Sequence, residues 1–209
     1  MKILPTLLIL ISLSSTTFGQ VDSIYSSESN SVTKLITELK KRDSTHFTFK
    51  GIPIDGSLNH FVAELKKQKF VIMKSSNEDA ILTGKFTGQE VHVLVQASTK
   101  AVYGVTVMFE SQSSWKAIKT QYENVKYNLI EKYGQPKETI EKFDAPYDEA
   151  EGLEFLALSD DKCTYMTQFV TPTGNGMIRL SISSEANLVI NYVDSINYLI
   201  VHGEALNEY

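Results

Sequence analysis

The stretch "AILTGKFTGQEVHVLVQA", residues 80–97, decides the fold class of this chain. Residues 87–90 have the composition of a turn, and the runs on both sides of the turn are rich in strand-forming residues. In the second run, alternation places three valines on one face of a strand: Val91, Val93 and Val95. Two strands joined by a short turn form a hairpin, so we expect an antiparallel sheet whose core lies on the valine face.

Upstream, residues 46–70 read "HFTFKGIPIDGSLNHFVAELKKQKF" and predict a strand, a turn and a helix. Asp55 or Ser57 can cap this helix, because a short side-chain oxygen accepts a free backbone N–H there. The helix has one apolar face, formed by Leu58, Phe61, Val62 and Leu65. Ahead of it, apolar residues at helical spacing predict a short amphipathic helix from Asn30 or Ser31 to about Arg42.

Downstream, apolar and β-branched runs alternate with turn signals. Strands are expected at 70–73 and 101–109, then a helix from Ser113 or Ser114 to Tyr133, which Gly134 and Pro136 end. Five further strand-like runs follow, at 139–143, 153–158 ("LEFLAL"), 163–170, 177–182 and 187–193, before a closing helix at about 195–206. The pattern predicts an α+β protein, an antiparallel sheet with helices on one face. Residues 46–112 and 113–209 read as two tandem halves, each a helix and about four strands, which suggests an internal repeat.

The N-terminus indicates export. Residues 1–19 have the basic start, apolar run and small residues of a signal peptide, with cleavage after Gly19, and the run is too short to span a membrane. A polar arm and the short helix follow at 20–45. Without Lys2 the mature chain has 19 basic and 25 acidic residues, a net charge of −6, which argues against a nucleic-acid partner. We therefore expect a periplasmic or secreted protein that does not span a membrane.

Cys163 is the only cysteine and reads as a small buried hydrophobe rather than a reactive thiol.

Catalytic motifs are absent from the sequence: it has no nucleophile elbow, zinc-protease motif, P-loop or dinucleotide fingerprint, and we expect no cofactor. His60 and Glu64 share a helix face but supply only two of the three or four ligands that a zinc site needs. Residues 144–161 hold seven carboxylates and no basic residue. This segment reads as a solvated acidic loop, with two alternatives: a calcium site at Asp144, Asp148, Glu149 and Glu151, or the carboxylates of a glycan or peptidoglycan hydrolase.

The remaining candidate is the sheet face that the helices leave open. Alternation assigns five polar binding candidates to it: Lys85, His92, Gln96, Arg179 and Asn191. A face of mixed polar and apolar side chains suits partner recognition, although antiparallel sheets also face water commonly. The sequence thus favours a non-enzymatic binding or envelope-accessory module whose partner is an envelope protein or a glycan.

The motif F-K-G-I-P-I-D-G at residues 49–56, with "ILTGKFTG" and "LIEKYGQP" further on, resembles an uncharacterised family of exported proteins of gut anaerobes. The resemblance runs from about His46 to the C-terminus and implies export but no activity and no catalytic residue. The order of helix and four strands is also similar to the tandem modules of β-lactamase-inhibitor proteins. That similarity is one of architecture and implies no inhibitory function.

Overall fold

The structure is a computed structural model, and it describes residues 33–38, 40–41, 45–149 and 152–205. Residues 33–38 and 40–41 are helical, and a small hairpin follows, formed by β1 (Thr48–Phe49) and β2 (Ile52–Pro53). The other elements are α2 (Leu58–Lys67), β3 (Val71–Ser75), β4 (Asp79–Phe86), β5 (Gln89–Ala97), β6 (Val102–Phe109), α3 (Trp115–Tyr133), β7 (Glu138–Phe143), α4 (Glu154–Ser159), β8 (Cys163–Val170), β9 (Gly176–Ile182), β10 (Leu188–Asp194) and α5 (Ser195–Ala205).

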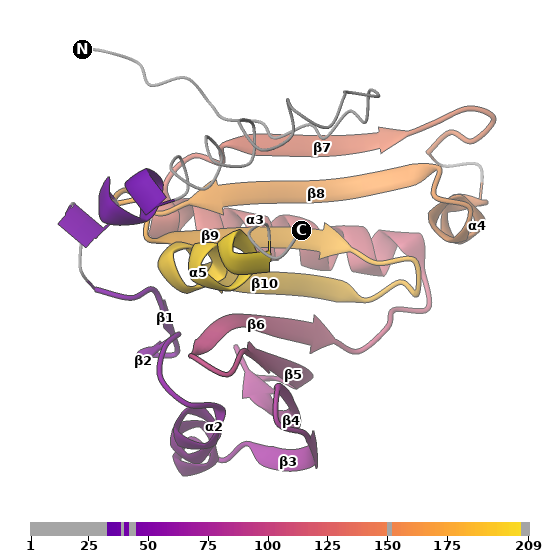
Figure 1. The fold of residues 1–209 in the computed structure, drawn as a ribbon. Helices are drawn as coiled ribbons and strands as arrows, with labels where there is room; N and C mark the ends of the chain where they lie inside the picture. Colours follow the sequence, from indigo (N-terminus) through magenta and orange to yellow (C-terminus); the bar gives the residue numbers. More distant parts are fainter. Residues whose placement is uncertain (1–32, 39, 42–44, 150–151, 206–209) are drawn as a thin grey trace, which may run out of the picture.

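Eight of the strands form one antiparallel sheet in the order β3-β4-β5-β6-β10-β9-β8-β7 (Figure 1). Each half of the chain contributes four consecutive strands as a meander, because short connections pair each strand with its neighbour in sequence. The two meanders join through their last strands, β6 and β10, which pair with Thr106 opposite Asn191. The sheet is therefore continuous across both halves, and side chains from both halves meet at its centre.

One face of the sheet carries the core. In β5, β6 and β10 every second side chain is buried, and paired residues such as Val93, Val107 and Ile190 are at most 1% exposed. Helix α2 packs against β4 and β5, and α3 packs against β8, β9 and β10. Both helices bury apolar side chains and begin at a serine cap, Ser57 or Ser114, whose side chain accepts a backbone N–H. Ser57 is one of the two caps that the sequence predicts for α2.

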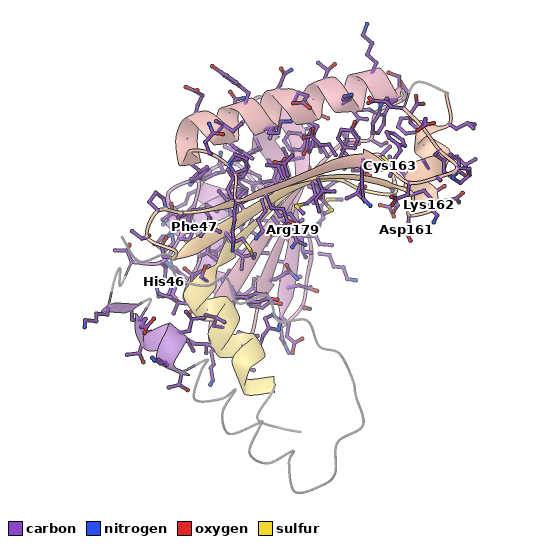
Figure 2. All side chains as sticks on the ribbon, turned by 90° about the horizontal axis from the view of Figure 1, so that it is seen from above. His46, Phe47, Asp161, Lys162, Cys163 and Arg179 are labelled. Atoms are coloured by element: carbon purple, nitrogen blue, oxygen red, sulfur yellow. The ribbon has the colours of Figure 1, made fainter. Side chains whose placement is uncertain are left out.

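The closing helix α5 lies on the opposite face. It contacts β6 and β10, and its Tyr198 and His202 pack against Tyr103, where β6 carries a bulge. Figure 2 shows α3 on one side of the sheet and α5 on the other. The fold class is the predicted one, an α+β antiparallel sheet with packed helices, but α5 departs from the expectation that the helices share one face.

A buried polar cluster fixes α5 and the segment ahead of β1 to the sheet. Asp194 is fully buried, and its two carboxylate oxygens accept the backbone N–H groups of Phe47 and Asn197, each at 2.8 Å. His46 Nδ1 lies 3.2 Å from the same carboxylate. The Asn197 amide in turn donates to the carbonyl oxygens of Ile54 and Val102, both at 3.0 Å. One carboxylate therefore caps α5 and also fixes the start of the first hairpin.

One predicted element is wrong. The run "LEFLAL" at 153–158, expected to be a strand, belongs to helix α4, which contacts β8. Its buried residues are Glu154, Ala157 and Leu158, spaced three and four apart as in a helix. The other predicted strands and the helices α2, α3 and α5 lie where the sequence predicts them, and β2 lies between the first strand and α2, where a turn was expected. The predicted signal peptide and the predicted caps Asn30 and Ser31 lie outside the described residues.

Candidate functional site: the uncovered sheet face

The face opposite α2 and α3 carries two rows of side chains that cross seven strands. Strand register places one row along Thr83, His92, Met108, Val189, Ser181, Met166 and Ile140. The second row runs along Ile81, Leu94, Thr106, Asn191, Arg179, Gln168 and Glu138. We call these two rows the uncovered face. Of the described helices, α2 and α3 pack on the other side of the sheet, and α5 packs on this side at the end that holds Tyr103.

Most side chains in the two rows are half-buried, and Arg179 and Glu138 are exposed. The first row includes four apolar residues: Met108, Val189, Met166 and Ile140. Because these apolar side chains are only half-buried, they keep more water contact than core residues do. A partner that covers them gains the free energy of their burial. The uncovered face thus combines apolar side chains with a polar centre.

The structure brings the five predicted binding residues onto this one side of the sheet. Asn191 accepts a hydrogen bond from Thr106 at 2.7 Å, and Arg179, labelled in Figure 2, donates to Gln168 at 3.4 Å. His92 Nε2 lies 3.7 Å from a carboxylate oxygen of Glu110, while its buried Nδ1 has no hydrogen-bond partner among the described residues.

The other two predicted residues lie away from the centre of the uncovered face. Lys85 pairs with Glu90 at 3.8 Å near the β4–β5 turn. Gln96 lies opposite Gly104, towards α5. Asn191, Arg179 and His92 are therefore the predicted residues that the two rows contain.

The methionines and Ile140 were not among the binding residues predicted from the sequence. Alternation in β8 could have placed Met166 on the side away from the buried Tyr165 and Thr167, but β7 shows no alternation, because its half-buried residues Ile140 and Phe143 are three apart. Alternation could not have shown that these residues share a row with His92. That row exists because β10 pairs with β6, a long-range pairing that no local pattern specifies.

The acidic segment is held to the body of the protein by individual contacts. Glu149 accepts hydrogen bonds from Lys119 and from the Trp115 indole, the latter at 3.0 Å, and these two contacts lower the pKa of its carboxyl. Asp160 accepts the Tyr147 hydroxyl at 2.5 Å, and Asp144 pairs with Lys142 at 2.9 Å.

These contacts do not support a calcium or a hydrolase site. Glu151 lies outside the described residues, and Asp148 is exposed. Within the described ranges, no group of three or more His, Cys, Asp or Glu side chains is arranged to hold a metal ion. The calcium and hydrolase readings of the segment both remain predictions.

The remaining sequence candidates are a pair of side chains on α2 and a buried thiol. Glu64 pairs with Lys67 at 2.6 Å rather than with His60. Cys163 is buried, as predicted, and burial raises the pKa of its thiol to about 12.

In the part of the chain that the structure describes, no helix has the length and apolar character that a membrane span requires.

Comparison with known proteins returns nothing for this chain: no family model, no curated protein and no solved structure matches it.

Proposed function

We propose that this protein is an exported, non-enzymatic binding module that contacts a partner protein of the cell envelope through the uncovered face. The observation that carries the proposal is the pair of rows across seven strands, in which apolar side chains flank the polar centre of Thr106, Asn191 and Arg179. Methionine and arginine are enriched in protein–protein interfaces, and a broad sheet face suits a macromolecular partner better than a small ligand.

The architecture adds support for a tandem origin of this face. Each half is a helix followed by a four-stranded meander, and the paired residues Thr106 and Asn191 are 85 positions apart (191 minus 106). The corresponding turns at Thr87 and Thr173 are 86 positions apart (173 minus 87). We infer that the halves 46–112 and 113–209 are an internal repeat. A repeat joined through its last strands makes one wide sheet, and therefore one wide face, from two small ones.

Affinity capture with matched variants tests the proposal. Met108→Lys places a charge in the first row, next to Val189, where association would have to bury it, and should reduce recovery of the partner about tenfold or more. Leu156→Lys is the control, because Leu156 is a 48% exposed apolar residue on α4, away from the uncovered face. Both variants should keep the melting temperature within a few degrees of the wild type. Equal recovery of every co-purifying protein by wild type and Met108→Lys would contradict the proposal.

A further inference from the structure

A groove on the opposite side of the molecule has the chemistry of a second binding site. It lies between α3 and the β4–β5 turn, with β10 as its floor, and encloses about 310 Å³. Ligand pockets of proteins begin at about this size. The groove has an apolar floor and a polar rim.

The floor is aromatic and aliphatic. Phe86, Tyr133, Ile190 and Tyr192 line it, and Tyr192 is only 6% exposed. The Tyr192 ring is held by Phe49, whose ring centre is 5.2 Å away. None of the hydrogen bonds of the described residues involves the Tyr192 hydroxyl, although its side chain lines the groove. Burial, together with the nearby Tyr133, raises the pKa of this hydroxyl, so it stays a neutral donor and acceptor.

The rim carries carboxamides. Gln121, Asn124 and Asn128 recur at three- and four-residue spacing along α3, and Gln89 faces them from the β4–β5 turn. Gln121 Nε2 donates to Gln89 Oε1 at 2.9 Å. This contact leaves the Gln121 Oε1 atom buried and without a donor among the described residues. A buried acceptor without a donor is costly, and a ligand hydroxyl could satisfy it.

We propose that this groove binds a sugar ring of a neutral oligosaccharide. Each carboxamide offers both a donor and an acceptor, and so does the Tyr192 hydroxyl, which matches a ligand whose hydroxyls are donors and acceptors themselves. The aromatic floor suits the C–H face of a saturated ring. Among the described residues that line the groove, none is a carboxylate and Lys132 is the single charged one, so its chemistry fits neither a metal ion nor a strongly charged ligand.

The site is tested by titrating the full chain with three neutral disaccharides: maltose, cellobiose and N,N′-diacetylchitobiose. At least one of them should bind saturably and shift the side-chain amide signals of Gln121, Asn124 and Asn128 in ¹⁵N NMR spectra. Sorbitol has hydroxyls but no ring face, and it should leave these signals unchanged. A neutral tripeptide of similar size should also leave them unchanged. Failure of all three sugars to bind, or the same amide shifts with the tripeptide instead, would overturn the proposal.

Tyr192→Phe is the decisive variant, because it removes a hydroxyl that bonds to no described residue. The variant should keep the wild-type melting temperature and lower the affinity for the sugar about tenfold, as expected when a site built around a hydrogen bond loses one partner. Tyr127→Phe is the matched control, since Tyr127 is 62% exposed on α3 and outside the groove. Unchanged sugar affinity in Tyr192→Phe would overturn the assigned role of this residue. This groove and the uncovered face can fail independently, because they lie on opposite sides of the sheet.

Discussion

Replacing Asp194 by asparagine tests the polar cluster that fixes α5 and the first hairpin. The Asp194 carboxylate accepts two backbone N–H groups, from Phe47 and Asn197, each at 2.8 Å, inside a fully buried site. Asparagine retains one acceptor oxygen and turns an NH₂ group towards the second N–H. The variant therefore loses one charge-assisted hydrogen bond and leaves a buried donor without a partner.

The expected loss is about 3 kcal/mol, since a hydrogen bond to a charged group contributes about 1.5–3 kcal/mol and an unsatisfied buried donor costs about 1–3 kcal/mol. For a domain of this size that loss lowers the melting temperature by roughly 6–12 °C. Chemical denaturation monitored by circular dichroism gives the free energy, and hydrogen exchange shows which amide is released.

Asp148→Asn is the control, because its carboxylate is exposed and a surface change of this kind should stay within about 0.5 kcal/mol. A loss of less than about 0.5 kcal/mol in Asp194→Asn as well would refute the assigned role of the Asp194 carboxylate. A destabilised variant whose Phe47 and Asn197 amides both exchange as slowly as in the wild type would refute that role equally.

Three further changes test separate parts of the structure. Gly84→Ala should lower the free energy of unfolding, measured by chemical denaturation, by about 1–3 kcal/mol. The new methyl carbon would lie 2.6 Å from the ring of Phe70, a side chain that is 2% exposed. Full wild-type stability would show that the ring moves aside freely. Cys163, with a thiol pKa raised to about 12 by burial, should resist iodoacetamide at pH 8 in the folded protein and react in denaturant, and fast labelling of native protein would contradict its burial. Since the pKa of the Glu149 carboxyl is lowered in the folded state, its contribution to the free energy of unfolding is present above about pH 4 and lost as the pH falls through the folded-state pKa. Glu149→Gln should therefore flatten the acid limb of the curve of stability against pH. An unchanged limb would show that the Lys119 contact contributes nothing to stability.

The inner strands of the sheet were predictable because one face of each is buried, and burial of one face imposes alternation. In β5, for example, Val91, Val93 and Val95 are buried while His92 and Leu94 are not. The edge strands β3 and β7 have no buried residue, so β-branched and apolar composition indicated them instead. The run at 153–158 was wrongly predicted to be a strand because six residues are too few to distinguish a period of two from a period of 3.6. Its partly exposed Phe155 and exposed Leu156 are apolar, which hides the helical spacing of the buried positions.

Neither candidate binding surface could be assembled from sequence alone. The uncovered face depends on the pairing of β6 with β10, residues some 85 positions apart (191 minus 106), and alternation cannot say which end α5 covers. The groove needs α3 to lie beside the β4–β5 turn, so that Gln121 meets Gln89, 32 residues away in sequence. The sequence shows the apolar stripe of α3, while the carboxamides beside it read as ordinary surface residues until their neighbours are known.

Site-specific cross-linking tests the central claim most directly. A photoreactive amino acid at Arg179, the exposed residue in the middle of the uncovered face, should give one discrete protein adduct in the envelope of cells that produce the protein. The same group at Tyr127, on the exposed side of α3, should give none, and Met108→Lys should abolish the adduct at Arg179. No adduct at Arg179, or the same adduct from Tyr127, would contradict the account of the uncovered face as the binding surface.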